Sequence, residues 1–350
     1  MADGPIDLKA PDAEAKLKQS TKPLIVLLDG KDFDVEWDIL KDIATVAHIN
    51  ARSLDEVTEL VYNEAVSVFM FHTLTLEKET LAKFKKLKII GRLGVGYNNI
   101  DIKAAAEQGI SVCNSPDYGV EEIADLTMCM ILDLHRRMHW YANMIKDGKK
   151  LHGVEEIAAA GRGATRVRGQ TLGIIGLGNA GIAVAVRAKA FGLKVLFYDP
   201  YLRHSIEKAL VIKRAMSLEE LLAKSDCLTL HCNLTKDNFH FIGENELRQM
   251  KKGSFIVNTA RGGLIDEEAL ARALKDGHIG AAGLDVHEKE PFTYTPDQPL
   301  HDAPNLICTP HSAFYSDQSL VEMRKTAAKD VLAYFTDKPM RNCVNARFFP

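Results

Sequence analysis

One segment near the middle of the chain, Thr171 to Pro200, constrains the fold more than any other. It reads TLGIIGLGNAGIAVAVRAKAFGLKVLFYDP: an apolar run, three glycines spaced G-x-G-x-x-G, an alanine-rich stretch and a second apolar run. The first glycine permits a tight turn, the second lets a phosphate approach the backbone, and the third lets a helix pack on a strand. Free N–H groups at the helix start attract phosphates. The pattern therefore predicts a strand–turn–helix–strand unit that binds a dinucleotide.

The second apolar run of this unit ends in Asp199, 18 residues after Gly181. A carboxylate at this place accepts hydrogen bonds from ribose hydroxyls and repels a 2′-phosphate, so the residues favour NAD over NADP. Arg203 follows four residues later, close enough that NADP stays an alternative cofactor. On the residues alone, a glycine turn in an ordinary α/β protein stays an alternative.

Length and composition bound the class of protein. The 350 residues allow two domains, and a net charge of −3 gives no basic footprint for direct nucleic-acid binding. The polar, acidic N-terminal residues predict neither a secretory signal nor a transit peptide, and no apolar run approaches membrane-spanning length. The six cysteines form no C-x-x-C pair, so we expect buried thiols and no metal site: Cys113, Cys129, Cys227, Cys232, Cys308 and Cys343.

Both halves of the chain alternate strand and helix patterns. Apolar runs between Pro23 and Pro116, and again between Arg168 and Pro310, are typical of buried parallel strands. The last helical pattern has no strand after it, so we expect it to pack on the first half. This predicts an α/β fold of two doubly wound parallel-sheet domains. A Rossmann domain (120–319) would be inserted into a flavodoxin-like domain (23–119 and 320–350), and residues 1–22 would form a flexible arm.

The stretch from 120 to 148 is the longest helical pattern in the chain. At 1.5 Å per residue it could reach about 40 Å, longer than a small domain needs. It is apolar over much of its length, so a second surface must cover it. We expect a homodimer that uses this helix, and dimers could pair further into tetramers.

Three polar residues follow strands of the second domain, where ligands bind in open α/β sheets. Arg261, Glu290 and His311 lie in the loops VNTARGGLID, LDVHEKEP and CTPHSAFYSD. An arginine can hold a carboxylate with two hydrogen bonds, a histidine can move a proton near neutral pH, and a carboxylate can orient that imidazole. Each residue alone is typical of a surface or structural position. Together they predict a site for interconverting 2-keto and 2-hydroxy acids.

Longer stretches resemble a known family. The chain is similar to the D-isomer-specific 2-hydroxyacid dehydrogenases over nearly its full length, and its long runs resemble the corepressor branch of that family, the C-terminal-binding proteins. The resemblance rests on these runs: NEAVSVFMFHTLTL, RAKAFGLKVLFYDPYL, SDCLTLHC, VNTARGGLIDEEALARALKDGHI, LDVHEKEPF, DAPNLICTPH and NCVN.

The resemblance implies roles for particular residues. Arg261, Glu290 and His311 would be catalytic. The substrate would meet Arg92, His72, Gly94 and Phe314, in the crevice between domains, and Phe314 stands where vertebrate corepressors have a Trp. NAD would contact a larger set: Gly176, Gly178, Asn179, Ala180, Gly181, Asp199, Cys232, Thr259, Ala260, Arg261, Asp285 and His311. Asn179 stands where many members have Arg, which removes one ion pair to the pyrophosphate.

The resemblance also implies a partner-binding role. A cleft that includes Ala47 and Val61 would bind P-x-D-L-S motifs of repressors, partly by strand addition. The protein would recruit chromatin-modifying enzymes to these repressors. It would be located in the nucleus, with a fraction in the cytoplasm. The alternative is a metabolic dehydrogenase without a corepressor role. The segment Pro5–Lys9, PIDLK, resembles the same ligand pattern with Lys9 in the serine position. We expect it to compete with peptide partners, although five residues can also match by chance.

Overall fold

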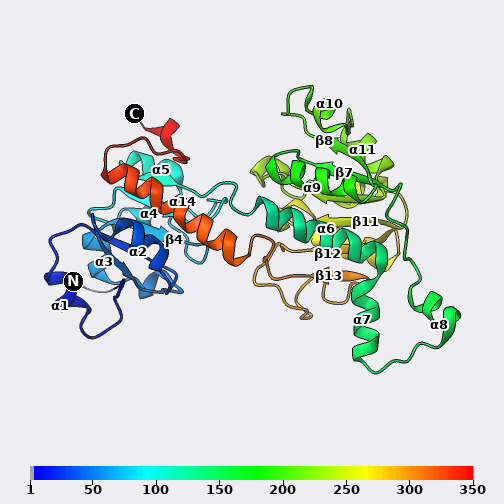
Figure 1. Ribbon diagram of the computed structural model, residues 1–350, viewed down its shortest axis with the longest axis horizontal. Helices are drawn as coiled ribbons and strands as arrows, with labels where there is room; N and C mark the ends of the chain where they lie inside the picture. Colours follow the sequence, from blue (N-terminus) through cyan, green and yellow to red (C-terminus); the bar gives the residue numbers. More distant parts are fainter. Residues whose placement is uncertain (1–3, 350) are drawn as a thin grey trace. The chain divides into compact units, whose positions relative to one another are not determined.

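The computed structural model describes residues 4–349. The chain divides into two compact units, one formed by Met1–Tyr118 with Ser316–Pro350 and the other by Gly119–Tyr315. Each unit contains one parallel sheet with helices packed against it (Figure 1). The predicted fold class, two parallel-sheet α/β domains, is confirmed.

The second unit has a seven-stranded sheet in the order β13-β12-β11-β10-β7-β8-β9, and the pairs are all parallel. The order reverses between β7 and β10, which is the place where nucleotides bind in doubly wound sheets. The strands are β7 (Thr171–Ile175), β8 (Lys194–Tyr198), β9 (Lys213–Arg214), β10 (Cys227–Leu230), β11 (Ser254–Asn258), β12 (Ile279–Leu284) and β13 (Leu306–Cys308).

Helices bury both faces of this sheet, because alternate strand residues belong to two different apolar clusters. Leu172 and Ile174 of β7 pack with helices α6 and α9, whereas Ile175 packs with α11, α12 and α13. This alternation is what a strand buried on both faces requires. The helices of the unit are α6 (Val120–Arg136), α7 (Met138–Lys146), α8 (Gly153–Ala160), α9 (Asn179–Ala190), α10 (Ile206–Leu210), α11 (Leu218–Lys224), α12 (Glu244–Gln249) and α13 (Glu267–Lys275).

The single helix predicted for 120–148 is wrong in one respect, since it is broken at Arg137. This residue adopts a left-handed conformation with φ of 59° and separates α6 from α7. Two contacts fix the break: the Arg137 guanidinium donates to Asn305 Oδ1 at 2.8 Å, and the Asp133 carboxylate accepts the His139 N–H at 2.8 Å. Helices α7 and α8 extend away from the sheet and bury none of their residues (Figure 1).

The first unit has a six-stranded parallel sheet in the order β1-β3-β2-β4-β5-β6. Without β1 this is the flavodoxin-like order 2-1-3-4-5. The strands are β1 (Ile6–Asp7), β2 (Leu24–Leu27), β3 (Thr45–His48), β4 (Ala65–Met70), β5 (Ile89–Arg92) and β6 (Ser111–Cys113), and the helices are α1 (Ala13–Lys18), α2 (Asp34–Leu40), α3 (Glu59–Glu64), α4 (Lys78–Leu81), α5 (Ile102–Glu107) and α14 (Asp317–Phe335).

The N-terminal arm differs from the flexible segment predicted for residues 1–22. Its first three residues lie outside the described residues, but β1 adds a strand to the edge of β3 and α1 follows. The physical reason is apolar burial, since Ile6 is 6% exposed and Ala13 is 4% exposed in the core of the unit.

Helix α14 packs against α2 in the first unit through a buried ion network. The Arg324 guanidinium donates to the Glu36 carboxylate at 2.7 Å and to the Asp32 carboxylate at 2.8 Å. Burial raises the pKa of the Glu36 carboxyl, and the hydrogen bonds from Arg324 oppose that rise. Ser316 begins α14 by accepting the Ser319 N–H.

Within residues 4–349, no helix is both long enough and apolar enough to cross a membrane. The same residues contain no group of three His, Cys, Asp or Glu side chains placed to hold a metal ion.

Candidate functional site

The residues predicted to be catalytic lie in loops that follow three neighbouring strands. Arg261 follows β11, Glu290 follows β12 and His311 follows β13. The first two loops touch, because a Cβ added to Gly262 would lie 2.0 Å from the backbone carbonyl of His287. The carboxyl ends of adjacent parallel strands share one edge of the sheet, so these loops form a single rim.

Glu290 and His311 form a hydrogen-bonded pair within this rim. The distance from His311 Nδ1 to Glu290 Oε2 is 2.8 Å, and the side chains are 33% and 32% exposed. A carboxylate can only accept, so Nδ1 carries the hydrogen, and Nε2 is the ring nitrogen that can gain and lose a proton. Glu290 Oε1 also accepts the His287 N–H at 3.1 Å. Burial acts to raise the pKa of Glu290, but the hydrogen bond and charge of His311 outweigh it and hold that pKa below its usual range.

Asp285 fixes the loop that carries His311. Its buried carboxylate accepts hydrogen bonds from Thr309 Oγ1 at 2.5 Å and from the backbone N–H groups of Ser312 and Ala313 at 2.8 Å each. The Asp285 carbonyl accepts the His311 N–H at 2.8 Å, and His311 itself has φ of 56°. The sequence resemblance implies that Asp285 contacts NAD. The structure adds a positioning role that no local pattern around Asp285 could have indicated.

The loop that carries Arg261 is closed by the side chain of Asn258. Its amide donates to the Arg261 carbonyl at 2.8 Å and its oxygen accepts the Ala260 N–H at 3.0 Å. The Arg261 guanidinium donates to the Ala260 carbonyl at 2.6 Å. Thr259 lies against α6, where its hydroxyl hydrogen-bonds to that of Thr127 at 2.8 Å. Asn258 is therefore a second positioning residue that sequence reasoning did not single out.

Phe314 lies beside the predicted acid–base residue. The ring centroids of Phe314 and His311 are 6.3 Å apart, in an edge-to-face arrangement. Its backbone and Cβ also approach Gly119, where an added Cβ would lie 3.4 Å away. The side chain predicted to contact substrate is thus next to the histidine.

The glycine turn is closely packed at Gly176 and Gly181 and open at Gly178. Gly176 has φ of 85°, and a Cβ there would lie 2.8 Å from the His231 carbonyl oxygen. A Cβ on Gly181 would lie 2.3 Å from the Gly176 carbonyl oxygen, so this glycine lets α9 pack closely on the turn. A Cβ on Gly178 would meet no protein atom within 4 Å. Packing alone therefore does not require glycine at 178, whereas an approaching ligand would.

Helix α9 begins directly after this turn. Gly178 is its N-cap and has no side chain that could cap the first turn. The predicted cofactor residues Asn179 and Ala180 are the first two residues of the helix. The N-terminus of α9 and the open space at Gly178 fit a dinucleotide phosphate.

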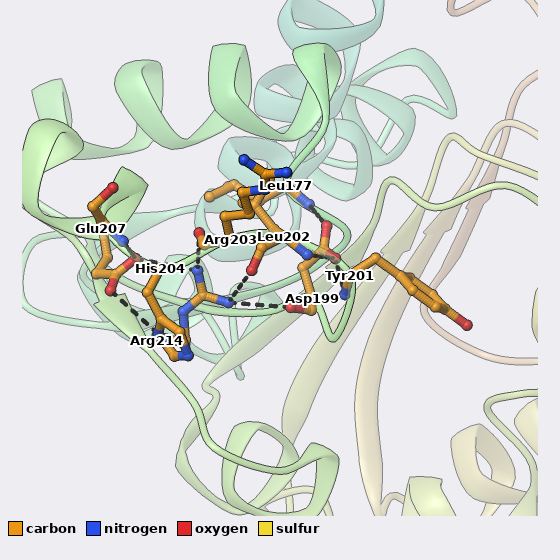
Figure 2. A network of polar contacts seen from close by, with 9 residues as sticks. Leu177, Asp199, Tyr201, Leu202, Arg203, His204, Glu207 and Arg214 are labelled. Carbon is orange, nitrogen blue, oxygen red and sulfur yellow. Dashed lines mark hydrogen bonds and ion pairs between the residues drawn. The ribbon is translucent and has the colours of Figure 1, made fainter.

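Asp199 lies at the end of β8, as predicted for a residue that contacts the adenosine ribose. Its Oδ2 accepts the Leu177 N–H at 3.0 Å, and its Oδ1 accepts those of Tyr201 and Leu202 at 3.0 and 3.1 Å (Figure 2). A carboxylate offers about four acceptor sites, so one stays available for a ribose hydroxyl. The same carboxylate shapes the loop, and at the predicted ribose site its negative charge would repel a 2′-phosphate.

Arg214 is a neighbour of this loop that sequence reasoning missed. Its guanidinium donates to the carbonyls of Asp199 and Leu202 at 3.2 Å each and to the Glu207 carboxylate at 3.1 Å (Figure 2). It also lies over the Phe197 ring, 4.6 Å from its centroid. Because these contacts occupy the cation, its arrangement is that of a loop support.

Cys232 follows β10 and packs against the glycine turn, since a Cβ on Gly176 would lie 2.9 Å from the Cys232 N. Burial raises the pKa of the Cys232 thiol to about 11 and lowers the pKa of the adjacent His231 to about 4. Both side chains are therefore neutral at pH 7. They add no charge near the predicted phosphate site.

The remaining predicted substrate residues lie in the first unit. Arg92 ends β5, is 7% exposed, and donates from Nε to Asn99 Oδ1 at 3.3 Å and from Nη1 to the Leu93 carbonyl. Gly94 follows with φ of 137°. His72 lies after β4 on an exposed loop, and Asp29 holds that loop by accepting the N–H groups on either side of His72. They stay predicted substrate residues.

Ala47 and Val61, the predicted peptide-cleft residues, are fully buried in the apolar cluster of the first unit. Ala47 is in β3 and Val61 is in α3. Ile6 of β1 pairs with Ala47 and belongs to the same cluster. The chain's own N-terminal segment thus lies where an added peptide strand is expected.

Comparisons with known proteins find a matching family model and two similar curated proteins. Residues 128–313 match the family model described as "D-isomer specific 2-hydroxyacid dehydrogenase, NAD binding domain". The chain is 45% identical to C-terminal-binding protein 1 of Caenorhabditis elegans over 329 residues, which are 93% of this chain and 45% of that protein. It is 38% identical to the glyoxylate reductase of Korarchaeum cryptofilum over 270 residues, which are 77% of this chain and 80% of the relative.

A solved structure is similar over most of both chains. The D-lactate dehydrogenase of Aquifex aeolicus, crystallised with NAD and lactic acid, matches with a TM-score of 0.77 and 31% identity, over 89% of this chain and 96% of that one. The chain spans less than half the length of the C. elegans relative. These matches confirm the resemblance that the sequence motifs predict.

Proposed function

Because the chain belongs to the D-isomer specific 2-hydroxyacid dehydrogenase family, we propose that His311 and Glu290 perform the acid–base step between a 2-keto acid and a 2-hydroxy acid. The protein is an NAD-dependent oxidoreductase of the 2-hydroxyacid dehydrogenase type. The observation that supports the assignment to these residues is the 2.8 Å hydrogen bond between His311 Nδ1 and Glu290 Oε2, which fixes the proton on Nδ1 and makes Nε2 the nitrogen that serves as acid and base.

When NADH is bound, it supplies the hydride for reduction of the keto group. The chain's own residues then have three tasks. His311 Nε2 donates a proton to the carbonyl oxygen, and the Arg261 guanidinium binds the substrate carboxylate. Glu290 keeps the proton on Nδ1 of His311 and stabilises the imidazolium before the proton is donated. Phe314 provides an apolar wall beside the histidine.

We further propose that the chain acts as an NAD-dependent corepressor scaffold that binds P-x-D-L-S motifs of repressors and works with chromatin-modifying enzymes in the nucleus. The support is the 45% identity to C-terminal-binding protein 1 across 93% of this chain. A second support is the edge of β3, which already accepts an added strand. The reductase chemistry would accompany this role.

A metabolic reductase is the second candidate. The hydrogen-bonded His311–Glu290 pair and the 38% identity to a glyoxylate reductase favour it. Two assays distinguish the two roles. In the first, a fluorescent P-I-D-L-S peptide and a P-I-A-A-S control peptide are each titrated with the protein to measure binding. In the second, the rate of glyoxylate reduction by NADH is measured. Saturable binding of the first peptide alone supports the scaffold. Turnover without peptide binding leaves the metabolic reductase.

The exposed helices α7 and α8 support a dimer that uses this region. Met138 and Ile145 of α7 are 66% and 61% exposed, and Val154 of α8 is 81% exposed. Large exposed apolar side chains on projecting helices are typical of a surface that a second subunit covers. We propose that this surface, Met138 to Ala160, forms the homodimer, and that dimers could pair further.

A further inference from the structure

We propose that the N-terminal segment Pro5–Lys9 is a tethered self-ligand that occupies the edge of β3 and must leave before an external peptide binds there. This inference rests on the proposed peptide-binding function and adds its regulation. The segment would lower the apparent affinity for partners, so that only extended peptides with a better fit displace it.

The segment pairs with the edge of β3 through its backbone. Ile6 and Asp7 pair in parallel with Ala47 and His48, and the Leu8 N–H donates to the His48 carbonyl at 2.9 Å. Without this segment β3 would be the outer strand of the sheet, with unpaired N–H and C=O groups. Such an edge is a template for any extended chain.

The apolar side chains of the segment pack against the first unit. Ile6 is buried in the same cluster as Ala47 and Val61, and Leu8 packs against that cluster as a half-buried side chain. Asp7 lies between them with an exposed side chain, which matches the alternation of a strand that is buried on one face. The apolar positions of the PIDLK pattern thus contact the sheet, and any chain with the same alternation presents the same groups.

The end of the segment indicates how it is released. The Asp7 carboxylate accepts the Lys9 N–H at 2.9 Å, and the Asp7 carbonyl accepts the Ala10 N–H at 3.1 Å, so a turn ends the strand after Asp7. Lys9 Nζ then reaches Glu56 at 2.7 Å and the Asn50 carbonyl at 3.3 Å. The Lys9 and Glu56 side chains are 47% and 39% exposed, so this ion pair is a weak, solvent-screened latch.

A short paired segment can hold the site only because it is tethered. A strand of two residues would bind weakly as a free peptide, but a short covalent connection gives it an effective concentration in the millimolar range. A partner's apparent affinity is its intrinsic affinity multiplied by the fraction of chains whose site is open. If the segment's intrinsic dissociation constant is roughly 0.1 mM, removing it should tighten binding by on the order of tenfold.

The test uses the fluorescent P-I-D-L-S peptide and fluorescence anisotropy. It compares the full chain with two variants that free the edge: deletion of residues 1–10, and Ile6→Ser with Leu8→Ser. The matched control is Glu14→Ser with Lys18→Ser, because these two side chains on α1 are each 80% exposed. Both edge variants should bind the probe on the order of tenfold more tightly than the full chain and the control.

Hydrogen exchange followed by mass spectrometry adds a second measurement. Saturating peptide should increase deuterium uptake in residues 4–12 of the full chain while β3 stays protected by the incoming strand. Equal affinities for all four proteins, or unchanged uptake in residues 4–12 at saturation, would overturn the proposal and leave peptide binding intact. If neither edge variant binds the probe, the proposed peptide-binding function fails and the self-ligand fails with it. An affinity difference that disappears on dilution would place the segment on a second copy and also overturn the proposal.

Discussion

Two glycines of the same turn should respond oppositely to the same small change. Gly178 has φ of −74°, and an added Cβ there meets no protein atom within 4 Å. At Gly181 an added Cβ would lie 2.3 Å from the Gly176 carbonyl oxygen. Gly178→Ala therefore places a methyl group in the space proposed for the pyrophosphate, whereas Gly181→Ala forces α9 away from the turn.

The expected sizes follow from these distances. Overpacking by one methyl group typically costs about 1–3 kcal/mol, and 1 kcal/mol shifts Tm by roughly 2–4 °C in a unit of this size, so Gly181→Ala should lower Tm by roughly 2–12 °C. Gly178→Ala should leave Tm unchanged or raise it slightly, because alanine restricts the unfolded chain at a permitted backbone conformation. Its NADH affinity should fall at least tenfold, about 1.4 kcal/mol.

The assay is thermal unfolding without nucleotide, followed by titration with NADH monitored by its fluorescence. Gly253→Ala is unsuitable as a control because Gly253 has φ of 82°, but Gly4→Ala is suitable because an added Cβ there meets no atom within 4 Å. If Gly178→Ala binds NADH as wild type does, the backbone at Gly178 is not the phosphate site. A loss of stability in Gly178→Ala would show that the turn needs glycine for packing.

Three further predictions concern other parts of the chain. Glu290→Gln should lower kcat for glyoxylate reduction by about 10²-fold or more with little change in NADH binding, because His311 loses the carboxylate that supports its charge; stopped-flow and steady-state rates check this. Arg324→Met should lower the free energy of unfolding by about 3–5 kcal/mol, because it leaves the buried Glu36 carboxylate unpaired. Denaturant titration measures this loss against the control Lys325→Met, which changes an exposed residue. The double variant Arg324→Met with Glu36→Met should recover most of the lost stability. Met138→Glu with Ile145→Glu should convert dimers to monomers in sedimentation velocity, and an unchanged mass would place the dimer surface elsewhere.

Local patterns predicted the Rossmann unit because they record requirements of the backbone. Each position in the turn requires glycine for a separate physical reason, so the three glycines recur at a fixed spacing that can be recognised in the sequence. Asp199 follows its strand at the spacing that the motif requires. The strand-end positions of Arg261, Glu290 and His311 could be predicted in the same way. Their assembly along one rim follows from the order of β11, β12 and β13, which apolar runs do not specify.

What the sequence did not indicate depends on contacts between distant residues. Asp285 supports the His311 loop from 26 positions away, a separation at which no local pattern is expected. Arg214 supports the Asp199 loop, although a basic residue there is equally typical of an exposed surface. The break at Arg137 depends on Asn305, and the order of the arm depends on apolar contacts with β3 and α3.

The proton-transfer pair is the centre of the proposed chemistry, and the rate of glyoxylate reduction by NADH tests it most directly. We predict that His311→Asn lowers kcat/KM by about 10²–10⁴-fold, far more than it weakens NADH binding, while Tm stays within error of wild type. Arg261→Ala should lose activity mainly through a higher KM, because it binds the substrate carboxylate. Wild-type turnover in His311→Asn, with unchanged folding, would contradict the assignment of the site.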